Sequence, residues 1–206
     1  MLRMDREPGD HDEVVVLRGV PWSQFVALAK LDLAGPRLAY LDGVLQLVSP
    51  GHYHEGCKTL LARLLECYVD VRGGYFDGFG AETYRKRRKQ AGVEPDECYV
   101  LDAKPKKVPD LAIEVVSTNE SIDKLEIYRR LGVREVWFWD EGELAIYHLS
   151  AGVYRQITRS RLLPRLDIAD LVRRVREVRP GGQAAAVRRY RRWLKRRRSP
   201  RRARRG

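Results

Sequence analysis

Two strongly apolar segments separated by one short helix constrain the fold of this chain more than any other feature. Residues 109–117 (PDLAIEVVS) and 133–140 (VREVWFWD) are apolar at most positions, a pattern typical of strands covered on both faces. The intervening residues predict a helix of about eleven residues, with Ser117 and Glu120 at capping-box spacing and Gly132 after its end. A strand, a helix and a second buried strand predict a right-handed parallel crossover.

The remaining elements follow from hydrophobic spacing and turn chemistry. Residues 57–71 carry apolar side chains at helical spacing, so one face of a long helix is expected to be buried. Asp42-Gly43 lies between two apolar runs and predicts a hairpin. Further predicted elements are a helix from Pro21, strands at 75–84, 94–101 and 108–116, a hairpin over 143–157 and an amphipathic helix over 166–178. Together they predict one α/β core with a mixed central sheet.

The net charge of +12 is concentrated at the C-terminus. Residues 180–206 contain 12 of the 40 basic residues and no acidic one, which leaves 28 basic and 28 acidic residues in the rest of the chain. We therefore divide the chain into a flexible N-terminus (1–13), a folded domain (14–179) and a basic tail (180–206) that is disordered or becomes helical on binding. A polycation binds phosphates by releasing counterions, so the tail indicates nucleic acid, with anionic lipid or no specific partner as alternatives.

Several classes of protein do not fit the sequence. The three cysteines, Cys57, Cys67 and Cys98, show no CxxC spacing, so neither a disulfide framework nor a zinc site is predicted. The chain has no uncharged apolar run of about 18 residues, and its start is acidic and polar rather than basic and then apolar. We expect a cytoplasmic protein without a membrane partner.

Two acidic residues are candidates for a shared site. If the strands that carry Asp96 and Glu114 form an antiparallel pair centred near Pro105, opposed residues have numbers that sum to about 210, and these two residues face each other. Their Cβ atoms would then lie about 5 Å apart, close enough for both carboxylates to hold one divalent cation. Asp110 lies about 13 Å from Glu114 along the same strand and is expected to stay outside the site.

The charges around this pair can be interpreted in two ways. Two neighbouring carboxylates on an apolar face repel each other and need a cation. Lys124 starts the following helix, where the macrodipole disfavours a cation. This placement suggests that acidic side chains lie close to Lys124. In the alternative interpretation, Asp96 begins a strand, Glu114 pairs with a surface arginine and Lys124 is solvated. On the long helix, the phase places Glu55 away from the apolar face and His54 near its edge, where a capping or hydrogen-bonded role is expected.

The sequence resembles a known family over most of its length. The resemblance is carried by YLDGVLQLVSP followed by HE, then TYR, EPDECYV, PDLAIEVVS and IDKLEIYRRLGVREVWFWD. These segments are similar to the Uma-type family of bacterial proteins described as restriction endonucleases, within the PD-(D/E)XK nuclease superfamily. The resemblance runs from about Trp22 to Val175 and is most specific from Glu94 to Asp140. It implies a restriction-endonuclease-like core of a helix, three strands, a helix and a strand.

The resemblance also implies an activity and its residues. It assigns Asp96 and Glu114 as the motif acids and Glu55 as the helix glutamate, all three as ligands of Mg²⁺ or Mn²⁺. The usual lysine position is Val116, so the resemblance implies that Lys124 takes over that role. The implied reaction is hydrolysis of a DNA phosphodiester, with a homodimer left open. Phosphate contacts are expected from Arg85, Lys86, Arg87, Arg88, Arg188, Arg189, Arg191 and Arg192.

One distance separates two hypotheses. The first is a metal-dependent DNA endonuclease. The second is a catalytically inactive nuclease-like module that binds nucleic acid. If Lys124 Nζ cannot come within about 5 Å of the acidic pair, the binding module is favoured, because a charge acts strongly only at short range.

Overall fold

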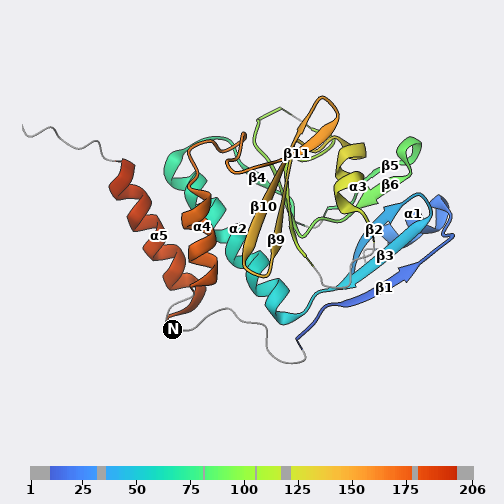
Figure 1. Cartoon of the computed structure of the whole chain (residues 1–206), viewed down its shortest axis with the longest axis horizontal. Coiled ribbons are helices and arrows are strands. Elements are labelled where there is room, and N and C mark those ends of the chain that lie inside the picture. Colours follow the sequence, from blue (N-terminus) through green and yellow to red (C-terminus); the bar gives the residue numbers. More distant parts are fainter. Residues whose placement is uncertain are drawn as a thin grey trace, which may run out of the picture.

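In the part of the chain that the structure describes, two β-sheets and five α-helices make up the fold (Figure 1). The structure is a computed structural model, and it describes residues 10–31, 36–80, 82–104, 106–116, 122–177 and 181–198. The elements mix helices and strands throughout the chain, so the predicted α/β class is confirmed.

The first sheet is antiparallel throughout. Its strands lie in the order β1 (Glu13–Leu17), β3 (Val44–Ser49), β2 (Arg37–Leu41), β6 (Ala91–Val93) and β5 (Tyr84–Lys86). The predicted hairpin joins β2 to β3, and Asp42 and Gly43 have φ values of 47° and 86°. Both values lie in the left-handed region that a tight hairpin turn requires. Helix α1 (Trp22–Ala29) covers one face of this sheet through the buried Phe25 ring.

The second sheet is mixed and contains the predicted crossover. Its strands lie in the order β11 (Val153–Ile157), β10 (Glu143–Ser150), β9 (Glu135–Asp140), β8 (Leu111–Val115), β7 (Glu97–Val100) and β4 (Asp77–Gly78). Strands β8 and β9 are parallel, and α3 (Lys124–Leu131) lies between them in the chain. All other pairings in this sheet are antiparallel. The two apolar segments, 109–117 and 133–140, therefore predicted the central pair of strands correctly.

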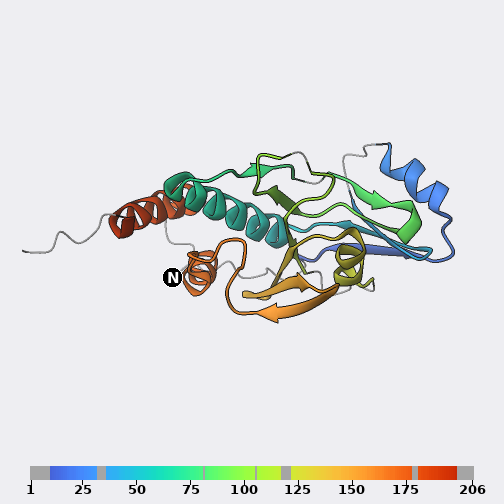
Figure 2. The same ribbon diagram turned by 90° about the horizontal axis from the view of Figure 1, so that it is seen from above.

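Helices cover both faces of the second sheet. The long helix α2 (His52–Arg72) packs on the face formed by Leu111, Ile113 and Val115, whereas Ala112 packs with α3 on the other face. Helices α4 (Ile168–Arg176) and α5 (Gly182–Arg198) pack against α2. Figures 1 and 2 show α5 alongside α2. Because β8 alternates between the two faces, Glu114 points to the α3 side of the sheet.

Two local predictions differ from the structure. The predicted strand over 75–84 divides into β4, which joins the second sheet, and the start of β5, which joins the first. A short 3₁₀ helix, η1 (Arg87–Lys89), then leads into β6. Helix α3 is capped by Asp123, whose side chain accepts a hydrogen bond from Glu126 N at 2.9 Å. The predicted capping residues Ser117 and Glu120 lie outside the described residues.

The ends of the folded part also differ from the predicted division of the chain. Of the segment 1–13, residues 10–13 are described, and Asp10 and Asp12 hydrogen-bond to the start of α2. The basic tail is not disordered between Gly182 and Arg198, where it forms α5 with Ala186, Tyr190 and Leu194 buried. The helical spacing of these apolar residues gives α5 a core-facing side, and this packing corrects the prediction of a tail that folds only on binding. No helix among the described residues has the length and apolarity to cross a membrane.

Candidate active site

The two acidic residues face each other across β7 and β8. Glu97 pairs with Ile113 and Cys98 pairs with Ala112, so the same antiparallel register places Asp96 opposite Glu114. The predicted register is therefore the observed one. Asp96 is 3% exposed and Glu114 is 1% exposed, and Asp96 Oδ2 accepts a hydrogen bond from Val115 N at 2.8 Å. This bond fixes the Asp96 carboxylate next to the strand that carries Glu114.

Helix α3 supplies two groups to Glu114. Lys124 Nζ donates to Glu114 Oε2 at 2.8 Å, and the Tyr128 hydroxyl donates to Glu114 Oε1. Lys124 is the first residue of α3 and Tyr128 lies four residues further on, so both side chains project from the same side of the helix. Burial raises the pKa of Tyr128, and the nearby Glu114 charge raises it further, which keeps the hydroxyl protonated as a donor.

His54 bridges two buried carboxylates. Its Nδ1 lies 2.9 Å from Asp12 Oδ2, and its Nε2 lies 2.9 Å from Asp96 Oδ2. Burial lowers the pKa of His54, but the two carboxylates outweigh burial and raise the pKa to about 9. Burial likewise raises the pKa of Asp96, and His54 together with Lys124 reverses this effect and lowers it. The site is therefore a row of alternating charges in which Asp96 is ionised and His54 is an imidazolium.

The N-terminal segment holds α2 in position for this contact. Asp12 Oδ1 accepts from Gly51 N at 2.7 Å, and the Asp10 carboxylate accepts from His52 N at 2.8 Å and Tyr53 N at 2.7 Å. Carboxylates at a helix N-terminus satisfy its free N–H groups and match its macrodipole. Asp10 and Asp12 could not be predicted as caps, because a cap that comes from about 40 residues away in the chain leaves no local spacing signal.

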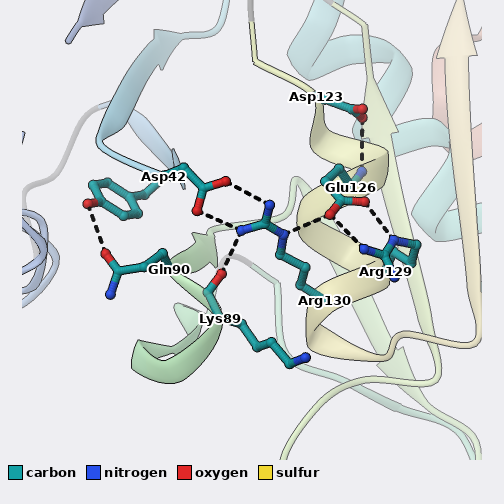
Figure 3. Close-up of polar contacts among 8 residues, drawn as sticks. Asp42, Lys89, Gln90, Asp123, Glu126, Arg129 and Arg130 are labelled. Atoms are coloured by element: carbon teal, nitrogen blue, oxygen red, sulfur yellow. Dashed lines mark hydrogen bonds and ion pairs between the residues drawn. The ribbon is translucent and has the colours of Figure 1, made fainter. Parts of the chain in front are cut away.

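Polar contacts with the first sheet fix α3. Arg130 donates to both carboxylate oxygens of Asp42, at 2.7 Å each, and to Lys89 O at 2.8 Å (Figure 3). Glu126 accepts from Arg129 and from Arg130 on the same helix. The hairpin turn of the first sheet is thus tied to the helix that presents Lys124.

Glu55 and Asp110 lie away from the acidic pair. The Glu55 side chain is 43% exposed and its Oε2 lies 2.6 Å from Lys58 Nζ, as the helical phase predicted. His54, the adjacent residue, is the α2 side chain that contacts Asp96. At the other end of β8, Asp110 accepts from Leu101 N and Lys106 and pairs with Arg134, so it is outside the site, as its spacing predicted.

The predicted phosphate contacts form two separate groups. Arg85, Lys86, Arg87 and Arg88 lie on β5 and η1, whereas Arg188, Arg189, Arg191 and Arg192 lie on α5. Figures 1 and 2 show β5 and α5 at opposite ends of the molecule. This separation could not be predicted from the sequence, because both groups are simple basic runs.

The donor set of the acidic pair fits a magnesium ion. Among the described residues, no three or more His, Cys, Asp or Glu side chains come together as metal ligands. Mg²⁺, however, is commonly bound by one or two carboxylates, with water and substrate phosphate completing its coordination. Asp96 and Glu114 provide two such carboxylates.

The fold and the site define a nuclease-like α/β protein. Its features are two opposed buried acids on neighbouring strands, a lysine from the crossover helix, and helices on both faces of a mixed sheet. Residues 22–179 match the model of the Uma2 family, described as "Putative restriction endonuclease", and the chain belongs to this family. This finding confirms the resemblance inferred from the sequence.

A solved structure shows the same fold. It is described as a "putative nuclease belonging to DUF820" from Anabaena variabilis, and it is 17% identical to this chain with a TM-score of 0.52. The match covers 70% of this chain and 95% of the other. A comparison with curated proteins gives no match.

Proposed function

We propose that the protein is a metal-dependent endonuclease that hydrolyses phosphodiester bonds in DNA. The observation that carries the proposal is the 2.8 Å contact between Lys124 Nζ and Glu114 Oε2, in a site where Glu114 faces Asp96. This contact supports a lysine recruited from α3 in place of Val116. Membership of the restriction endonuclease family supports a nuclease of some kind.

Asp96 and Glu114 are the residues that would hold the metal. Bound Mg²⁺ or Mn²⁺ supplies an attacking water of lowered pKa and neutralises charge on the phosphate. The inference that Glu55 adds a third carboxylate stays a prediction, and its ion pair with Lys58 does not favour it.

The protein side chains prepare the two carboxylates and the phosphate site. His54, itself held by Asp12, keeps Asp96 ionised inside the protein. Tyr128 orients Glu114 by donating a hydrogen bond to Oε1. The Lys124 ammonium provides a fixed positive charge where negative charge grows on the phosphate, and such preorganised charge is a large contribution to catalysis.

The contact distance favours the endonuclease over the inactive binding module. Lys124 Nζ lies 2.8 Å from Glu114 Oε2. This distance is within the limit of about 5 Å that was set from the sequence for an active nuclease. The basic groups on β5, η1 and α5 would contact phosphates and position DNA without reading its sequence. Because the two basic groups lie at opposite ends of the molecule, they would contact a DNA duplex at two separate places.

A nicking assay on supercoiled DNA with Mg²⁺ or Mn²⁺ tests the proposal. We expect the intact protein to nick the plasmid and Asp96→Asn to be inactive. Lys124→Ala should lose roughly 10²- to 10³-fold in rate, the usual effect of removing one preorganised charged or hydrogen-bonding group. Glu55→Gln serves as the matched carboxylate control on α2, and full activity in this variant would exclude Glu55 as a required ligand.

Two results would contradict the proposal. Equal nicking by the intact protein, Asp96→Asn and Lys124→Ala would mean that a contaminant cleaves the DNA. Binding of DNA without any cleavage in either metal, by protein that is folded by circular dichroism, would favour the binding module.

A further inference from the structure

A small pocket lies beside the last turn of α2, at the opposite end of this helix from His54. Its volume is about 290 Å³, close to the lower limit for small-molecule sites. The walls come from the end of α2, from the glycine turn 73–74 that follows it, and from the loop 162–165 before α4. At 1.5 Å per residue, Arg72 lies about 27 Å along α2 from His54, so this pocket is separate from the acidic pair.

Two guanidinium groups line the pocket without an acidic counterpart. Arg72 belongs to α2 and Arg165 to the loop before α4, and no Asp or Glu of the described chain lines the pocket. Neither arginine forms an ion pair with another described residue. Arg72 Nε is buried and has no hydrogen-bond partner among the same residues, and a buried donor without an acceptor is costly. The pocket is therefore suited to an anion.

The Tyr68 hydroxyl lies within the field of both arginines. Burial raises the pKa of Tyr68, whereas the positive charges of Arg72 and Arg165 lower it in part. Charges act strongly only at short range, so both guanidinium groups lie near the same hydroxyl. The α2 macrodipole explains one arginine at the end of this helix. It does not explain a second arginine that comes from about 90 residues later in the chain.

Aromatic rings form the other part of the pocket wall. Tyr75 and Phe76 follow the glycine turn and line the pocket together with Tyr68. The Phe76 ring stacks on Tyr99 of β7 with a centroid distance of 4.4 Å, so it is fixed in the wall. Tyr75 is 48% exposed and presents a ring on which a planar group can stack.

The buried Glu135 carboxylate fixes the loop that carries Arg165. Ser160 Oγ donates a hydrogen bond to Glu135 at 2.7 Å, and the backbone N–H groups of Arg161 and Leu162 donate at 2.5 Å and 3.1 Å. These contacts hold the loop in one conformation beside α2. A wall that is already ordered lowers the entropic cost of binding a ligand.

We propose that this pocket binds a nucleoside monophosphate, with the phosphate between Arg72 and Arg165 and the base against the Tyr75 ring. Arginine binds phosphate through strong, charge-assisted hydrogen bonds, and a base of any identity can stack on an aromatic side chain. The small volume favours a single nucleotide over a longer ligand. The same chemistry occurs in a free nucleotide and at the phosphorylated end of a DNA strand.

Isothermal titration calorimetry of the full chain with thymidine 5′-monophosphate tests the arginines. The titration contains EDTA, so that no metal at the acidic pair contributes. Arg72→Gln and Arg165→Gln should each weaken binding roughly 10- to 100-fold, the usual effect of one charge-assisted hydrogen bond. Arg165 is exposed, so its variant is expected to fold even if Arg72→Gln does not. The matched control is Arg155→Gln on β11, where the arginine is exposed, and this variant should bind like the intact protein.

Ribose 5-phosphate, which has no base, tests the aromatic wall. The intact protein should bind it more weakly than thymidine 5′-monophosphate. Tyr75→Ala should weaken binding of the nucleotide roughly 5- to 150-fold, the effect of losing one stacked base, and should leave binding of ribose 5-phosphate unchanged.

A third titration distinguishes the two sources of the nucleotide. Loss of binding in the arginine variants with thymidine 5′-monophosphate identifies a free nucleotide as the ligand. The same loss only with a 5′-phosphorylated oligonucleotide, and not with its unphosphorylated form, identifies the end of a strand. Absence of both losses, or equal binding of thymidine 5′-monophosphate and ribose 5-phosphate, would overturn the proposal. None of these measurements requires DNA cleavage, so the pocket can be confirmed even in an inactive protein.

Discussion

At the scale of single residues, the site depends on buried charges that compensate one another. Asp12→Asn keeps an oxygen for the hydrogen bond from Gly51 N but removes the charge beside His54. Breaking one side of a buried ion pair costs about 3 kcal/mol or more. We expect the free energy of unfolding, measured by urea denaturation, to fall by about this amount.

Asp10→Asn is the control for Asp12→Asn. Asp10 also accepts hydrogen bonds from the start of α2, but these include an exposed contact to His52 N. Asparagine is as good a helix cap as aspartate, so the loss should stay below about 1 kcal/mol. Equal losses in the two variants would show that the ion pair with His54 contributes nothing beyond capping.

Asp110 is a residue whose charge stabilises the fold in a pH-dependent way. Burial raises its pKa, but Lys106, Leu101 N and Arg134 outweigh burial and lower it from the usual 3.8. A lowered pKa in the folded state means that the stabilisation is present above pH 3.8 and is lost as the pH falls through the folded-state value. The melting temperature of Asp110→Asn should therefore be below that of the intact protein at pH 7, and the gap should narrow below pH 4. A constant gap would contradict this assignment.

At the scale of elements, α1 packs on the first sheet at a glycine. A Cβ atom at Gly92 of β6 would lie 2.5 Å from Cζ of Phe25. Gly92→Ala should therefore destabilise the protein by roughly 1–3 kcal/mol, the usual cost of overpacking. Adding Phe25→Leu removes the atoms that clash, so the double variant should lose less than the sum of the two single losses. Additive losses in thermal or urea unfolding would contradict the contact.

The elements also show what local sequence can and cannot predict. The Asp42-Gly43 hairpin, α2 and the crossover from β8 to β9 follow from turn chemistry and hydrophobic period, and all are present. The division into two sheets was not predicted, because β6 pairs with β5 on one side and on the other side with β2, which lies about 50 residues earlier in the chain. Strand alternation specifies which face is buried but not which partner is adjacent.

The same distinction applies to the site. Asp96 and Glu114 face each other because of the register of one antiparallel strand pair, and this register could be predicted from the residue numbers. The choice of His54 rather than Glu55 depends on how α2 sits over the end of the sheet, and Asp10 and Asp12 fix that position from a distant segment. A one-residue difference rotates a helical side chain by about 100°, so helical phase alone placed His54 only at the edge of the buried face.

At the scale of the whole molecule, the basic tail is both a packed helix and a charged surface. Tyr190 and Leu194 of α5 are buried against α2, and the Arg174 guanidinium of α4 lies 4.6 Å from the centre of the Tyr190 ring. Truncation after Arg179 removes these contacts and exposes the surface beneath them. At roughly 1.5–3 kcal/mol for each large apolar side chain that loses its burial, we expect the truncated protein to unfold at a clearly lower urea concentration.

A charge-only variant separates this packing from DNA binding. Arg188 and Arg192 are exposed on α5, so replacing both with glutamine should leave the urea midpoint unchanged. If these arginines contact phosphates, the slope of log affinity against log salt should fall by about 2, because each lost contact releases about one counterion fewer. Truncation should lower both stability and the salt slope, whereas the double glutamine variant should lower only the slope. An unchanged slope in the double variant would remove α5 from the DNA-binding surface and leave it a purely structural helix.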